Sequence, residues 1–182
     1  MKNRFIFALL FCYSFIAPAQ DISFSSQQEH AVEWMEATSQ FTGPAIGSQL
    51  PEEITEKIKN SAEAKKLYVL HFWYVGSGAM AAEADYLRKL QKEFKDQPNI
   101  AFISFVASPE EEVQAYVQEN GNFGYKLLSL ESPEELESQL GIKAFTTHML
   151  VNGKGEILEN FTAAIDFEEM YEHYRNKIQE QL

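Results

Sequence analysis

The sequence has 182 residues, of which 45% are hydrophobic, and a formal net charge of −12. This length is sufficient for one complete globular domain with an extension. The acidic balance argues against nucleic acid and anionic lipid as binding partners, because both carry negative charge.

Residues 1–19 have the pattern of a secretory signal peptide. Lys2 and Arg4 precede an apolar core over 5–16, and residues 17–19 form a small-x-small cleavage site. The apolar core is too short to cross a bilayer, and no later segment is long and apolar enough to do so. We therefore expect an exported protein, periplasmic or secreted, whose mature chain has no membrane span; a buried N-terminal helix is the alternative.

The single cysteine, Cys12, lies inside this predicted signal peptide. The mature protein would therefore contain no thiol and could form no disulfide, even though export would place it in an oxidising compartment. Because thiol–disulfide exchange requires a thiolate that attacks sulfur, the composition predicts that the mature chain lacks this chemistry.

Residues 20–65 are expected to form an N-terminal extension, with an edge strand and helices, that packs on the core. A loop over 42–49 precedes Pro51, a residue favoured in the first turn of a helix. Ile54 and Ile58 then lie on one face of that helix.

The central part of the chain predicts a strand, a tight turn and a long helix. Residues 67–74 are apolar except for His71, which suits a strand covered on both faces. The Gly-Ser-Gly sequence at 76–78 ends the strand, and the helix is expected over 78–96. Glu83 lies on its apolar face, either at the edge of that face or as a buried acid with a raised pKa.

The rest of the chain predicts a strand, a helix, a short extended segment, a short helix, a β-hairpin and a final helix. Their ranges are 100–106, 109–121, 125–130, 133–141, 149–161 and 166–182. Capping boxes at Ser108 and Ser132 mark two helix starts, Asp166 caps the last helix, and an Asn-Gly turn joins the hairpin. The crossover rule makes the two long strands parallel.

This order predicts an α/β fold over residues 66–182. Its mixed sheet contains a βαβ unit followed by a short helix, a β-hairpin and a C-terminal helix, with helices on both faces. No second domain or internal repeat is expected.

The segment from Leu67 to Glu83 resembles the active-site region of the thioredoxin-like family, especially its exported TlpA-like branch. There, a strand ending in Phe-Trp is followed three residues later by Cys-x-x-Cys at the start of a helix. Phe72 and Trp73 are present here, but residues 77–80 are Ser-Gly-Ala-Met. Glu83 matches a glutamate that many TlpA-like proteins carry three residues after the second cysteine. The resemblance extends to about residue 165 and implies a thioredoxin-like fold.

The family also has a cis-proline that faces the Cys-x-x-Cys motif. Residues 141–151 match the segment that carries it, with Thr146 at the position of the proline. Because a cis bond before a residue other than proline costs about 2.5–4 kcal/mol, we expect the Phe145–Thr146 bond to be trans, unless the fold enforces the cis form. At Ser77, Met80 and Thr146 the resemblance therefore implies a degenerate site without redox activity.

Two other types of site are compatible with parts of the sequence. Ser77, at a strand-to-helix turn, resembles a nucleophile elbow, and His148 is a candidate base for a hydrolase; the alternative role for Ser77 is a helix N-cap. The sequence from Gly76 to Ala81 fits a dinucleotide fingerprint, but the expected acidic residue is missing at the end of the next strand.

No metal or cofactor is expected from the spacing of metal-ligating residues. The four histidines show no ligand spacing, and no cysteine remains in the mature chain. Each histidine is interpreted as a core or surface residue whose hydrogen bonds are satisfied.

The surface around the degenerate site is the candidate binding patch. Its residues are Trp73, Tyr74, Val75, Ala79 and Phe145. An apolar patch there would bind a protein or peptide of the cell envelope; alternatively, these side chains fill the space once used for catalysis. The sequence predicts a non-catalytic binding or structural module. The rival is an enzyme that uses Ser77, or Glu83 together with a substrate thiol.

Overall fold

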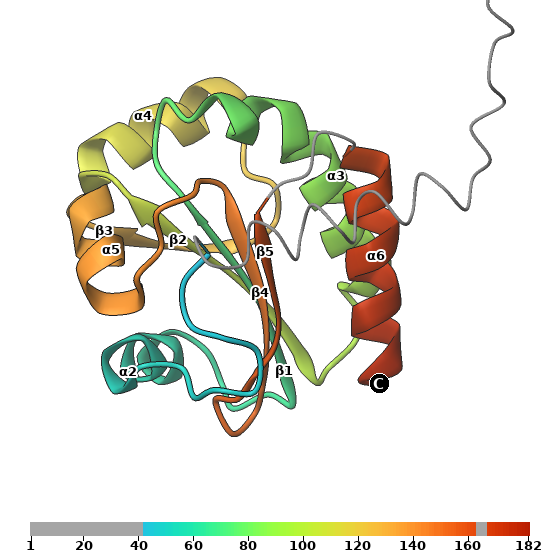
Figure 1. Cartoon of the computed structure of the whole chain (residues 1–182). Helices are drawn as coiled ribbons and strands as arrows, with labels where there is room; N and C mark the ends of the chain where they lie inside the picture. The colour runs from blue at the N-terminus through green and yellow to red at the C-terminus, as the bar shows by residue number, and fades with distance from the viewer. Residues whose placement is uncertain (1–41, 163–166) are drawn as a thin grey trace, which may run out of the picture.

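The computed structural model describes residues 42–162 and 167–182. The predicted signal peptide, the first half of the predicted extension and the expected cap Asp166 lie outside this part of the chain. The elements, shown in Figure 1, are α2 (Glu52–Ser61), β1 (Leu67–Trp73), α3 (Gly78–Phe94), β2 (Ile100–Ala107), α4 (Glu110–Asn120), β3 (Lys126–Leu130), α5 (Pro133–Leu140), β4 (Thr147–Asn152), β5 (Ile157–Thr162) and α6 (Phe167–Glu180).

The five strands form one mixed sheet in the order β3-β2-β1-β4-β5. β1 pairs in parallel with β2, and β2 with β3, whereas β4 and β5 are antiparallel to their neighbours. The predicted mixed sheet is confirmed, and the segment predicted as merely extended at 125–130 provides its outermost parallel strand. β1 lies at the centre, and all seven of its residues are buried.

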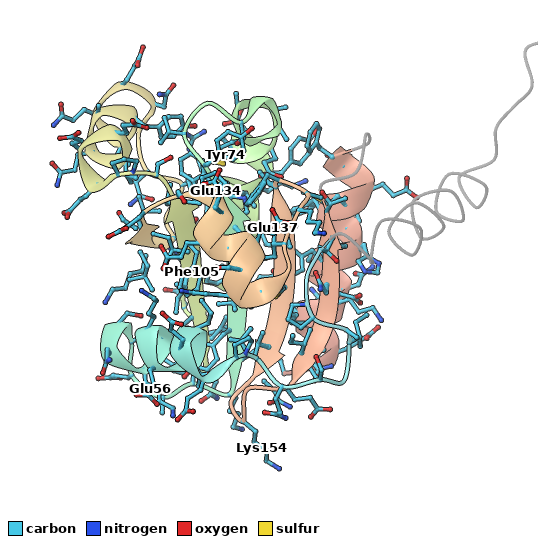
Figure 2. The ribbon with its side chains drawn as sticks, turned by 60° about the vertical axis from the view of Figure 1, so that its left-hand side comes forward. Glu56, Tyr74, Phe105, Glu134, Glu137 and Lys154 are labelled. Atoms are coloured by element: carbon cyan, nitrogen blue, oxygen red, sulfur yellow. The ribbon has the colours of Figure 1, made fainter. Side chains whose placement is uncertain are left out.

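Helices cover both faces of the sheet, as predicted (Figure 1). Alternate residues of β1 point to opposite sides: Val69 and Trp73 join the core under α3 and α6, while Leu70 and Phe72 join the core under α2 and α5. In Figure 2, α2 and α5 lie in front of the sheet and α6 lies behind it. The apolar run of β1 is therefore explained by burial on both faces.

The chain before β1 packs on the second of these cores. Ile54 and Ile58 of α2 are both buried against it. The loop before α2 also adds to the edge of the sheet: Gly47 N donates to Ile157 O (2.8 Å), and Ile157 N donates to Ser48 O (2.9 Å). Among the described residues, no helix has the length and apolar character needed to span a bilayer.

The start of α4 differs from its predicted capping box. α4 begins after Pro109, with no capping hydrogen bond from a side chain. The hydroxyl of Ser108 instead accepts a hydrogen bond from the backbone N–H of Val75 (3.0 Å). The predicted capping box is wrong because the Ser108 hydroxyl bonds to Val75, a residue distant in sequence, instead of to the start of α4. This contact joins the carboxyl ends of β1 and β2. Ser132 is at the N-cap of α5, also without a side-chain capping bond.

Candidate functional site

The positions that the resemblance matched to a redox motif lie where β1 gives way to α3. Ser77 is the N-cap residue of α3 and Met80 is in its first turn; both are buried. Thr147 pairs with Phe72 across the sheet, which places the preceding Thr146 beside the end of β1. Ser77, Met80 and Thr146 therefore all lie near the carboxyl end of β1.

The Phe145–Thr146 peptide bond is cis, so the expectation of a trans bond is wrong. Thr146 is fully buried, and its carbonyl accepts a hydrogen bond from the hydroxyl of Thr162 (2.8 Å). The packing around the segment, rather than the intrinsic preference of the peptide bond, therefore determines its geometry.

The hydrolase arrangement that the sequence left open is not formed. The Ser77 hydroxyl is buried and has no hydrogen-bond partner within the part of the chain that the structure describes, and it makes no side-chain capping bond. His148, the candidate base, directs its Nε2 at Glu83 instead. Ser77 thus lacks the hydrogen-bonded base that would activate a nucleophile.

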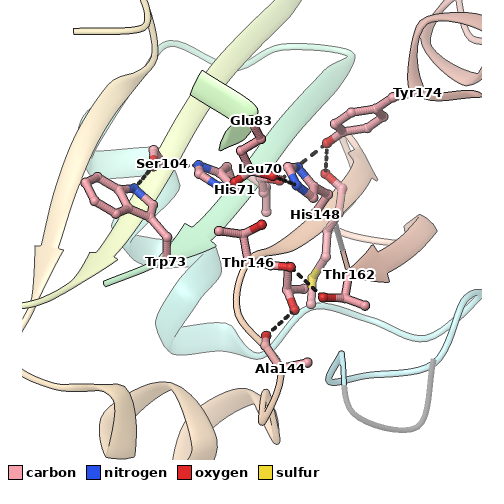
Figure 3. Close-up of polar contacts among 12 residues, drawn as sticks. Leu70, His71, Trp73, Glu83, Ser104, Ala144, Thr146, His148, Thr162 and Tyr174 are labelled. Carbon is pink, nitrogen blue, oxygen red and sulfur yellow. Dashed lines mark hydrogen bonds and ion pairs between the residues drawn. The ribbon is translucent and has the colours of Figure 1, made fainter. Parts of the chain in front are cut away.

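Beneath the motif lies a buried cluster of two histidines and a glutamate (Figure 3). His71 on β1 and His148 on β4 are register partners in the sheet, and Glu83 reaches them from α3. His71 Nε2 is 2.8 Å from Glu83 Oε1, and His148 Nε2 is 3.1 Å from Glu83 Oε2. All three side chains are completely buried, so the carboxylate is shared between the two imidazoles away from solvent.

A second layer of contacts fixes the ring of His71. Trp73 Nε1 donates to Ser104 Oγ (2.8 Å), and Ser104 Oγ lies 3.3 Å from His71 Nδ1. With its lone pair engaged by the indole, the Ser104 hydroxyl can donate its proton to Nδ1. If Nδ1 of His71 accepts this proton, the ring carries its own proton on Nε2, and Nε2 donates that proton to Glu83. The His148 ring stacks on His71, with 4.9 Å between the ring centroids.

The pKa of Glu83 depends on its burial and on the two histidines beside it. Burial by itself would raise the pKa of Glu83, but the adjacent imidazoles of His148 and His71 outweigh it and lower the pKa to about 2. Of the two interpretations left open by the sequence, the buried acid is correct, but its pKa is lowered rather than raised, because helical periodicity indicates burial and does not show the partners. Burial lowers the pKa of His71 despite the attraction of Glu83. The cluster thus contains an ionised carboxylate that two imidazoles stabilise.

Comparison with solved structures settles the fold. The thioredoxin domain of a thiol-disulfide oxidoreductase from Bacteroides vulgatus superposes with a TM-score of 0.57 at 18% identity, covering 73% of this chain and 97% of that one. A thiol-disulfide oxidoreductase from Bacteroides fragilis gives a TM-score of 0.54 at 21% identity, covering 68% and 88%. The chain has a thioredoxin-like fold. No protein-family model matches the sequence, and no curated protein matches it.

On this thioredoxin-like fold, the candidate binding patch is less exposed than the sequence suggested. Trp73 is fully buried, with its indole N–H bonded to Ser104, so its assignment to a surface patch is wrong. Tyr74, Val75, Ala79 and Phe145 are half-buried. Tyr74 and Phe145 pack edge to face, with 5.3 Å between their ring centroids.

Sequence reasoning missed the association of Glu83 with both histidines of the thioredoxin-like core. The two histidines show no ligand spacing because β1 and β4 are distant in the chain. A signal was nevertheless present, because Glu83 was placed on the apolar face of the helix that follows the strand of His71. The register between His71 and His148 could not be derived from the sequence.

Proposed function

We propose that this is an exported thioredoxin-like protein without redox activity that acts as a binding or structural module of the bacterial cell envelope. The observation that carries the proposal is the chemistry at the redox positions. Ser77 and Met80 occupy them, both are buried, and the one cysteine of the whole chain is Cys12. Without a thiolate, disulfide exchange has no nucleophile.

Export is supported by the basic, apolar and small-residue pattern of residues 1–19. Cleavage after this segment would also remove Cys12, which leaves a mature chain without any thiol. Such a chain could reside in an oxidising compartment without forming mixed disulfides.

A binding role is supported by the half-buried apolar residues at the carboxyl end of β1. Tyr74, Val75 and Phe145 lie where the parallel strands β1 and β2 end, and in open α/β sheets this edge is the usual place for ligands. The partner that fits these residues is a protein or peptide segment that presents an apolar side chain to Tyr74 and Phe145.

The absence of redox activity is tested by the reduction of insulin with dithiothreitol as the electron donor. We expect the purified mature chain to leave the rate at the value for dithiothreitol alone, because it supplies no thiolate. A cysteine-containing thioredoxin serves as the positive control. Acceleration by the wild-type chain would refute the proposal, and its loss in Ser77→Ala would support the rival enzyme.

The binding role is tested by affinity capture from the cell envelope of the source bacterium. We expect a defined partner whose recovery falls at least about tenfold with Tyr74→Ala, since an apolar anchor in an interface contributes roughly 2 kcal/mol. Ile46→Ala is the matched control, because Ile46 is exposed and lies beside the start of β5, at the opposite end of the sheet. Equal recovery with both variants would exclude the surface at the end of β1.

A further inference from the structure

The buried cluster brings together three groups that bind transition metals. The candidate ligand atoms of His71, Glu83 and His148 all lie within 4.8 Å of one another. In a tetrahedral zinc site, metal–ligand bonds of 2.0–2.2 Å place neighbouring donors about 3.4 Å apart. The nitrogen–oxygen distances of 2.8 Å and 3.1 Å are shorter than this by about 0.6 Å and 0.3 Å, so the side chains would have to rotate apart to admit a metal.

The charge of the cluster also favours a cation. When Nε2 is the only protonated nitrogen of each imidazole, both rings are neutral, and the carboxylate leaves one negative charge in the core. Among the described residues, the ion-pair partners of Glu83 are these two histidines and no lysine or arginine. A buried carboxylate is costly unless a positive charge or a metal compensates it, and a divalent cation would supply that charge.

The outer contact of one of the two histidines has the arrangement that a metal-binding histidine requires, whereas Nδ1 of His148 has no hydrogen-bond partner among the described residues. A histidine that binds metal through Nε2 carries its proton on Nδ1 and donates it to a neighbouring acceptor. Ser104 Oγ lies 3.3 Å from His71 Nδ1, and a hydroxyl can accept as well as donate. Ser104 is itself held by Trp73, so the ring of His71 keeps its orientation in both the metal-free and the metal-bound forms.

We propose that His71 Nε2, His148 Nε2 and the Glu83 carboxylate form a three-ligand site for zinc or a similar divalent transition metal. Two imidazoles and one carboxylate suit these ions, whereas calcium and magnesium prefer sites made of oxygen atoms. The Thr146 hydroxyl is buried without a hydrogen-bond partner among the described residues, and Figure 3 shows it directed toward the histidines. It is a polar neighbour for a water as the fourth ligand.

This site does not depend on the proposed binding function, because none of its ligands is Ser77, Met80 or Thr146 and none lies on the surface at the end of β1. The test uses purified protein without a histidine tag. The protein is stripped with EDTA, incubated with excess zinc chloride and separated from free metal by gel filtration. Elemental analysis is expected to find about one zinc per chain in the wild type and almost none in His148→Gln.

His173→Gln is the matched control. His173 also lies beside a glutamate, with 3.4 Å between its Nε2 and Glu159 Oε2, but it is partly exposed and belongs to no three-ligand group of the described residues. This variant should keep the full zinc content. Ser104→Ala keeps all three ligands and removes the outer contact, and it should bind zinc about 10- to 100-fold more weakly.

A second measurement on the wild type decides the question if His148→Gln fails to fold, which circular dichroism would show. Cobalt titration should produce visible absorption bands typical of four- or five-coordinate nitrogen and oxygen ligands, with saturation at one equivalent. Failure of the wild type to retain zinc or to develop these bands would overturn the proposal. Equal zinc retention by a folded His148→Gln variant would overturn it as well.

Discussion

Glu83→Ala is expected to lower the free energy of unfolding by about 3–5 kcal/mol, because it leaves two buried N–H donors without an acceptor and opens a cavity in the core. His71 and His148 would each lose the carboxylate oxygen that now accepts their Nε2 protons, at 2.8 Å and 3.1 Å. Neither imidazole can turn to water, since both side chains are completely buried. Urea unfolding followed by circular dichroism in EDTA measures the change without any contribution from metal.

Two further variants separate the stability that the buried cluster contributes from the general effect of removing an acidic side chain. Asp85→Ala removes an exposed carboxylate from the same helix, where it pairs with Arg88 at 2.6 Å, and should cost at most about 1 kcal/mol. Glu83→Gln should cost less than Glu83→Ala: the amide oxygen still accepts from one histidine. His148 can move its proton to its unpartnered Nδ1 and accept from the amide nitrogen. If Glu83→Ala and Asp85→Ala cost the same, the cluster does not stabilise the fold.

The fold could be predicted from the sequence because its signals are local. β1 shows a continuous apolar run, α3 begins after a Gly-Ser-Gly turn, and an Asn-Gly turn joins β4 to β5. Each of these signals depends only on residues that are close together in the sequence. Contacts between distant segments therefore did not change the element that the signal predicts.

The site could be predicted only in part, because its properties depend on contacts between distant segments. Ser108 fits a capping box, yet it accepts from Val75 N instead, because the ends of β1 and β2 meet. Trp73 was assigned to a surface, yet β2 places Ser104 under its indole. For Glu83, burial was one of two alternatives, and the raised pKa that went with it is wrong, since the two histidines that lower the pKa come from separate strands.

The protein is expected to lose stability steadily as the pH falls below about 6.5, with the steepest loss between about 4.5 and 2. In the folded state the pKa of Glu83 is lowered from 4.5 to about 2. Its stabilising contribution is therefore complete above 4.5 and is lost as the pH falls toward 2. The pKa of His71 is lowered from 6.5 by burial, so the unfolded chain takes up that proton first, which favours unfolding in the same direction.

The shift of Glu83 corresponds to about 3 kcal/mol, with no reduction for solvent screening because the carboxylate is fully buried. The groups that face it are His71 from β1 and His148 from β4. Urea unfolding at a series of pH values in EDTA measures the profile, and Glu83→Gln is the matched variant. Other carboxylates contribute equally to both proteins, so the wild-type curve should fall more steeply below pH 4.5. Parallel curves would show that Glu83 titrates with its ordinary pKa and that the two imidazoles do not stabilise its charge.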